Sequence, residues 1–227
     1  MALPVAPMAL PVANDDNGGQ FTTHHVVDIH VWGKALSVVY MNDPISVVSS
    51  IQTMEQFLAE DKYRVVGFDL EYTIGRAWHD QKVAVAQLCV RHDIFVYHYH
   101  LSTRPCDRFS RFINSSDYSF ATVDTTNDLK ALKVSDLKCP NLVNIQHHYK
   151  VWGSDKNKLN SLVDLASAII DPYYAKMKEE SNKDKNAWHS MWHERLDEHV
   201  KYAAMDAYTS YEMYRRIVDM RNRLLPD

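Results

Sequence analysis

RVVGFDLEY, residues 64–72, is a short apolar run with two acids close to its end, and the prediction of the fold starts from it. Its β-branched and aromatic residues predict a buried strand. Residues two apart in a strand point to the same face, so Asp69 and Glu71 lie together. Two carboxylates beside a core strand repel each other unless a cation lies between them.

The residues around this strand predict a sheet with helices packed on it. VAVAQLCV (83–90) and IFVYHY (94–99) predict a strand hairpin, and HVVDIHVWG (25–33) with ALSVVYM (35–41) predicts another around Gly33. Between the two hairpins, DPISVVSSIQTMEQFLAED (43–61) shows helical spacing. Asp43 is its expected N-cap, and Pro44 suits the first helical position.

Downstream of residue 100, strands and helices alternate. The pattern predicts helices over residues 106–114, from 127, over 158–170 and over 194–224, and strands at 119–125 and 141–145. Strands gathered early and then alternating with helices favour an α/β fold, with a mixed β-sheet flanked by α-helices.

The last predicted helix contains an acid in an unexpected place. The apolar face of this helix includes Ala203 and Ala207, and Asp206 lies between these residues on the same face. An ionised carboxylate there is costly unless something pairs with it. Tyr202 lies four residues before Asp206 and therefore shares its helix face.

A fourth acid, Asp128, follows a predicted strand, and Asp124 lies close by in the sequence. Each acid also has a simpler explanation. Asp128 is a possible helix N-cap, Asp206 a possible buried acid bonded to a Tyr or Trp, and Asp69 with Glu71 a possible pair of surface charges at a strand edge. Together, each beside an apolar element, the four acids favour a site for hard divalent cations, which bind carboxylates and substrate phosphate.

Three segments that carry these residues resemble the motifs of the DEDDy class of 3′–5′ exonucleases. The segments are FDLE (68–71), NDLKAL (127–132) and YAAMDAYTSYEMY (202–214). They are most similar to the Werner-syndrome-like exonuclease domain of plants, over about residues 22–222. LNSLVDLASAI (159–169) resembles the helix that precedes the third motif. The second motif of the family usually carries glycines before its Asp, whereas this chain has Ala121 and Thr122.

The resemblance implies a ribonuclease-H-like (DnaQ-like exonuclease) fold. It implies Asp69, Glu71 and Asp206 as direct ligands of two Mg²⁺ or Mn²⁺ ions, with Asp69 bridging them. Asp128 would hold the second ion or its coordinated water, and Tyr202 would position the attacking water. The implied reaction is two-metal-ion hydrolysis of DNA, or also RNA, from a 3′ end to nucleoside 5′-monophosphates.

Composition limits the number of domains and the kinds of partner that are expected for the chain. The 227 residues, 46% of them hydrophobic, suffice for one domain, expected over 21–227. Residues 1–20 contain MALPVA twice and are expected to be a flexible tail. A net charge of −4 excludes a broad basic surface, so a nucleic-acid partner must engage a small area or rely on metal ions.

No apolar run is long enough to cross a membrane, so we expect no membrane partner. The three cysteines are scattered and form no zinc pattern. They indicate an intracellular protein of the nucleus, the cytoplasm or both.

Four alternatives stay open from the sequence. The chain is a possible silent relative that serves as a protein-binding module, or an RNA-trimming enzyme of the RNase D kind, for which the site residues would be identical. His189 and His193, four apart, are a possible zinc pair that lacks an apparent third ligand. Tyr72 is expected either to stack on a terminal base or to pack in the core.

Overall fold

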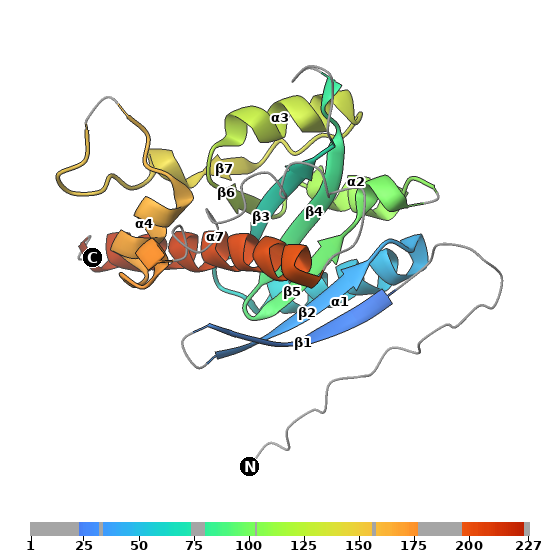
Figure 1. Ribbon diagram of the computed structural model, residues 1–227, viewed down its shortest axis with the longest axis horizontal. Coiled ribbons are helices and arrows are strands. Elements are labelled where there is room, and N and C mark those ends of the chain that lie inside the picture. The colour runs from blue at the N-terminus through green and yellow to red at the C-terminus, as the bar shows by residue number, and fades with distance from the viewer. Residues whose placement is uncertain are drawn as a thin grey trace, which may run out of the picture.

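A seven-stranded mixed sheet forms the centre of the protein (Figure 1), in the order β1-β2-β5-β4-β3-β6-β7. The computed structural model describes residues 23–31, 34–73, 80–102, 104–155, 158–176 and 197–224. Helices cover both faces of the sheet. The structure therefore confirms the predicted α/β class, with a mixed sheet flanked by helices.

The strands follow the predicted hairpins and then add parallel neighbours. Within the sheet, β1 pairs antiparallel with β2, β4 pairs antiparallel with both β3 and β5, β2 is parallel to β5, and β6 lies parallel between β3 and β7. The strands are β1 (Thr23–Val31), β2 (Lys34–Met41), β3 (Val65–Tyr72), β4 (Val83–Val90), β5 (Asp93–Tyr97), β6 (Ser119–Thr122) and β7 (Leu142–Asn144).

Helices α1 (Pro44–Glu60), α2 (Asp107–Ile113) and α3 (Thr125–Val134) contribute to the hydrophobic cluster on one face of the sheet. Helices α4 (Leu162–Ile169) and α7 (Asp197–Leu224) contribute to the cluster on the other face. Figure 1 shows the long α7 crossing the sheet, where it contacts β3, β4, β5 and β6. Two single-turn 3₁₀ helices, η2 (Tyr99–Leu101) and η3 (Ile145–His147), follow β5 and β7.

Strand β3 lies inside the sheet and contributes side chains to the hydrophobic clusters on both faces. Val66, Phe68 and Leu70 pack toward α1 and α2, whereas Val65 packs toward α7. Side-chain alternation then directs Asp69 and Glu71 to the α7 face. Because β4 and β6 flank β3, the strand-edge explanation of these two acids is wrong.

The observed start of one helix agrees with the start predicted from the sequence, and the observed starts of two others differ from it. Asp43 caps α1 by accepting hydrogen bonds from the backbone N–H groups of Ile45 and Ser46, as predicted. The helix expected over residues 158–170 begins only at Leu162, because Ser161 and Asp164 form a reciprocal capping box.

The N-cap of α3 is Asp124, which has left-handed backbone geometry and accepts a hydrogen bond from the backbone N–H of Thr126. Asp128 lies within the helix. The N-cap explanation of Asp128 is therefore wrong, and its buried carboxylate needs another account.

Several predictions concern residues outside the described part of the chain. These are the N-terminal tail over 1–20, the turn at Gly33, the pair His189 and His193, and residues 194–196 of the last helix. The domain boundary at residue 21 stays a prediction. Among the described helices, none combines the length and the apolar character that a membrane crossing requires.

Candidate metal centre and active site

The carboxylates of Asp69, Glu71 and Asp206 converge on one point. Each offers an oxygen, and these three oxygens all lie within 4.8 Å of one another. Asp69 and Glu71 come from β3, and Asp206 comes from α7, which packs across that strand. Residues that are distant in the sequence thus form one acidic cluster, as the spacing and the resemblance predict.

Gly67 permits this approach of α7 to β3. A Cβ atom at Gly67 would lie 2.1 Å from the backbone oxygen of Ala207 and 2.7 Å from the Cβ of Tyr211. Only a residue without a side chain allows the two backbones to come so close. A lone glycine in an otherwise apolar strand pattern is the sequence signal of such a contact.

The cluster is costly without a cation. Burial, followed by the charges of Asp206 and Asp128, raises the pKa of Asp69 well above its ordinary range, and the same causes act on the pKa of Glu71. Burial raises the pKa of Asp206 to about 7, against an opposing hydrogen bond from Tyr202. Among the described residues, no Lys or Arg forms an ion pair with these three acids.

The donor set fits hard divalent cations. Three carboxylates within bridging distance are the ligands that Mg²⁺ and Mn²⁺ prefer, whereas zinc favours His and Cys. The partial burial of Asp69 and Glu71 leaves the cluster accessible to solvent and to a substrate. Asp206 is 9% exposed.

Tyr202 lies beside Asp206, one helical turn earlier in α7, and donates a hydrogen bond to its carboxylate. The negative charge of Asp206, together with burial, raises the pKa of Tyr202 above its ordinary value. The phenol therefore keeps its proton at neutral pH and is available as a hydrogen-bond donor. Asp206 is therefore a buried acid that is hydrogen-bonded to a tyrosine, as one alternative from the sequence proposed. It also belongs to the acidic cluster.

Asp128 lies near the cluster but outside the group of converging oxygens. Its charge still raises the pKa of Asp69 and of Glu71. One of its oxygens accepts a hydrogen bond from the hydroxyl of Tyr72, and the other accepts one from the hydroxyl of Thr122, at 3.1 Å. Burial raises the pKa of Asp128 to about 6, although both hydrogen bonds oppose the shift.

Two residues thus gain roles that the sequence analysis did not assign. Thr122 stands where the resembled family has glycine, and its hydroxyl holds Asp128. Tyr72 packs its ring against the cluster of α1 and α2 and directs its hydroxyl to Asp128, which favours the core alternative. A polar residue at the end of a buried strand was the available signal for Thr122.

The comparisons with known proteins agree with this geometry. The sequence model of the 3′–5′ exonuclease family matches residues 45–221. No curated protein matches the chain at a significant level.

Three solved structures are similar in fold. The exonuclease domain of Nibbler from Aedes aegypti is 16% identical, with a TM-score of 0.58 over 83% of this chain and 90% of that domain. The catalytic core of RRP6 from Trypanosoma brucei is 14% identical, with a TM-score of 0.61 over 82% of this chain and 47% of that one. RNase D from Escherichia coli is 13% identical, with a TM-score of 0.59 over 81% of this chain and 45% of that one.

This chain thus spans less than half the length of the RRP6 core and of RNase D. At these identities the matches establish the fold, which is the ribonuclease-H-like fold expected from the sequence.

Proposed function

The chain belongs to the 3′–5′ exonuclease family, and from that membership we propose that it removes nucleotides one at a time from the 3′ end of DNA with the help of two divalent cations. Asp69, Glu71 and Asp206 would hold Mg²⁺ or Mn²⁺. The observation that carries the proposal is the convergence of their three carboxylate oxygens within 4.8 Å. The motif resemblance supports a place in the DEDDy class and a likeness to the Werner-type domain of plants.

Bound cations would supply activation of the attacking water and stabilisation of charge on the phosphodiester oxygens. The fold fixes the positions of the three carboxylates. Asp69 and Glu71 are fixed by the pleat of an internal strand, and Asp206 is fixed by a helix that rests directly on Gly67. This rigid placement orients the reacting groups before the substrate arrives.

Tyr202 and Asp128 complete the proposed site. Tyr202 would hold the water through its hydroxyl oxygen, which accepts a hydrogen bond while its own proton is donated to Asp206, and its raised pKa makes it a poor acid. Asp128 would complete the coordination sphere of the second ion from a carboxylate held by Tyr72 and Thr122. The product would be a nucleoside 5′-monophosphate.

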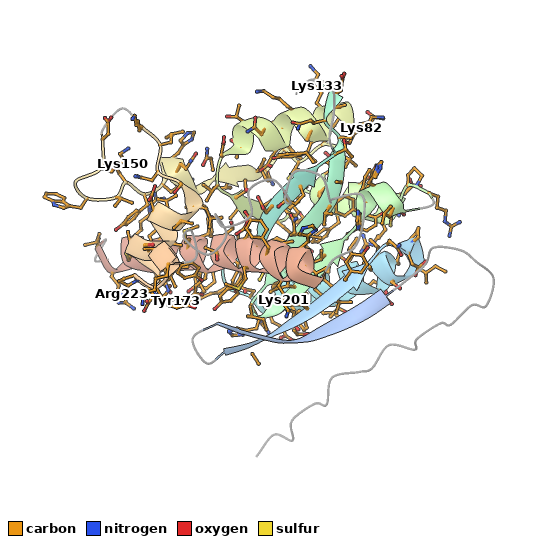
Figure 2. The ribbon with its side chains drawn as sticks, viewed as in Figure 1. Lys82, Lys133, Lys150, Tyr173, Lys201 and Arg223 are labelled. Carbon is orange, nitrogen blue, oxygen red and sulfur yellow. The ribbon has the colours of Figure 1, made fainter. Side chains whose placement is uncertain are left out.

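Exposed lysines border the carboxyl end of β3 and support contact with substrate phosphates. Figure 2 shows Lys82 and Lys133 at the same end of the molecule, where the backbone N–H of Val83 donates to the hydroxyl of Ser135. Lys82 also joins β3 directly, because its carbonyl accepts a hydrogen bond from the backbone N–H of Thr73. These side chains would supply the small positively charged area that an acidic protein needs to bind nucleic acid.

We place the enzyme inside the cell, in the nucleus or the cytoplasm. All three cysteines, at positions 89, 106 and 139, are buried and unpaired, which supports a reducing compartment.

The test uses 5′-labelled single strands of DNA and of RNA with the same sequence, incubated with Mg²⁺ or Mn²⁺. We expect a ladder that shortens by single nucleotides from the 3′ end of DNA. Asp69→Asn and Asp206→Asn should each lose at least ~10²-fold in rate, the scale of a lost electrostatic contribution. Asp117→Asn, at an exposed bend, is the matched control and should retain full activity.

The outcomes separate the alternatives. Full activity in Asp69→Asn and Asp206→Asn rejects the assignment of the site. Digestion of RNA in preference to DNA replaces the DNA proposal with the RNA-trimming alternative. The absence of both digestion and calorimetric binding of Mn²⁺ favours the silent protein-binding module.

A further inference from the structure

Gln87 is a buried amide whose hydrogen bonds are unaccounted for. It is the one amide in β4, a strand that is buried along its whole length, and it is 0% exposed. Neither its Oε1 nor its Nε2 has a hydrogen-bond partner among the residues that the structure describes. An unsatisfied amide destabilises a core, and an apolar side chain of the same shape would not. Packing therefore does not explain a glutamine at this position.

Strand register places Gln87 beside the acidic cluster. Gln87 lies directly opposite Asp69 on β3 and opposite Val96 on β5. Opposite residues in antiparallel strands point to the same face, with Cβ atoms about 5 Å apart. The Gln87 side chain therefore lies on the α7 face of the sheet, next to a carboxylate of the candidate metal centre.

The same-face neighbours of Gln87 within β4 are apolar. Val85 and Cys89, two residues away in β4, belong to the hydrophobic cluster that α7 covers. Helix α7 contributes Ala203, Ala204 and Ala207 to the same cluster, all fully buried. The register brings the Asp69 carboxylate directly opposite the amide, and Glu71, which lies opposite Val85, is its diagonal neighbour.

We infer that Gln87 is a positioning residue for Asp69, and that its Nε2–H group donates to the Asp69 carboxylate when the site holds its cations. A carboxylate that binds a metal is itself normally held by a hydrogen bond from a neighbouring residue. The two methylene groups of glutamine give the amide the reach to cross from one strand to the next. The bond would fix the Asp69 rotamer, so that its remaining lone pairs face the cations. This inference rests on the proposed function.

The test compares Gln87→Met with wild type. Met has a similar length and no amide, so the variant should fold with a melting temperature equal to or above that of wild type. Its affinity for Mn²⁺, measured by calorimetry on metal-free protein, should be ~10–100-fold weaker. Its kcat should fall while KM for the oligonucleotide stays unchanged. A purely structural role would lower the melting temperature and leave the affinity for Mn²⁺ untouched.

Ser50→Ala is the matched control. Ser50 is a buried residue of α1, on the opposite face of the sheet, and its hydroxyl also lacks a partner among the described residues. Removing it deletes an unsatisfied polar group far from the acids, so the affinity for Mn²⁺ should not change.

A second measurement uses wild-type protein and does not depend on the folding of a variant. Addition of Mg²⁺ should shift the side-chain amide resonance of Gln87 and slow its hydrogen exchange. An unchanged amide signal, or wild-type Mn²⁺ affinity and kcat in Gln87→Met, overturns the inference while leaving the proposed function intact. If wild-type protein binds no Mn²⁺, the proposed function fails first and this inference fails with it.

Discussion

At the scale of single residues, the protonation state of Tyr202 determines which role its hydroxyl can take in the proposed site. The neighbouring charge of Asp206 raises the pKa of Tyr202, so the phenol donates a hydrogen bond rather than accepting a proton. In the proposed mechanism its hydroxyl oxygen would position the attacking water, while the carboxylates would provide the metal ligands. Tyr202 and the acids would then have different roles, and substitutions should separate those roles.

Tyr202→Phe should lower kcat by ~10²-fold, on the scale of a lost proton-positioning group, and leave the affinity for Mn²⁺ unchanged. Single-turnover digestion and calorimetry measure the two effects. Tyr214→Phe, a partly buried tyrosine of the same helix, should behave as wild type. A parallel loss of Mn²⁺ binding in Tyr202→Phe would assign Tyr202 to metal binding instead.

Thr122 acts through a single hydroxyl. It supplies one of the two donors that hold the Asp128 carboxylate, and Tyr72 supplies the other. Thr122→Val keeps the shape and removes the donor, so the rate should fall by ~10-fold or more, as when a group that orients a metal ligand is lost. Thr122→Ser should restore the rate. Equal rates in Thr122→Val and wild type would show that Tyr72 alone holds Asp128.

At the scale of elements, the seating of α7 on β3 controls the geometry of the acidic cluster. The contact runs through Gly67, where the backbone of α7 at Ala207 touches the strand. Asp206 immediately precedes Ala207, so any displacement of the helix at this point displaces a candidate ligand. The contact between β3 and α7 therefore affects the position of a candidate metal ligand as well as the packing of the core.

Gly67→Ala should destabilise the protein by about 1–3 kcal/mol, the cost of overpacking a core, and lower the melting temperature by several degrees. Activity measured well below that temperature should fall further than the unfolded fraction explains, because Asp206 moves. The control is Gly153→Ala, where no atom lies within 4 Å of the added Cβ but φ is +77°, so the strained backbone should lower stability while the activity of the folded protein should not change. Full activity in Gly67→Ala would mean that the helix can shift without moving the site.

At the scale of the whole molecule, the unpaired acids link stability to pH. Burial raises the pKa of Asp206 to about 7 and that of Asp128 to about 6, from an ordinary value of 3.8. The metal-free folded state therefore holds protons that the unfolded chain has already released. The contribution of these two acids to stability is therefore greatest below about pH 4 and decreases as the pH rises toward 7.

The melting temperature of metal-free protein in EDTA should accordingly fall by several degrees between pH 5 and pH 8, because each pKa unit corresponds to about 1.4 kcal/mol. Asp206→Asn should show a smaller fall. Mn²⁺ should raise the melting temperature of wild type, and more at pH 8, where the ligands are ionised. A melting temperature in EDTA that is flat, or that rises equally in wild type and Asp206→Asn, would contradict this linkage.

The local features of this protein could be predicted from the order of its residues alone. The hairpins, the helix that begins after Asp43, the shared strand face of Asp69 and Glu71, and the shared helix face of Tyr202 and Asp206 all follow from periods of two or 3.6 residues. These patterns need only nearby residues, so they can be predicted before any tertiary contact is known. The resemblance of three short motifs then predicted that the acids meet.

The arrangement of these strands and helices in space depends on long-range contacts that the local patterns do not contain. The order of the strands, the seating of α7 on Gly67, the hydrogen bonds from Tyr72 and Thr122 to Asp128, and the placement of Gln87 beside Asp69 all join distant segments. No local period encodes such contacts, because they depend on which strands pair and on which backbones approach closely enough to exclude a side chain. That long-range packing brings Asp206 to the acids of β3.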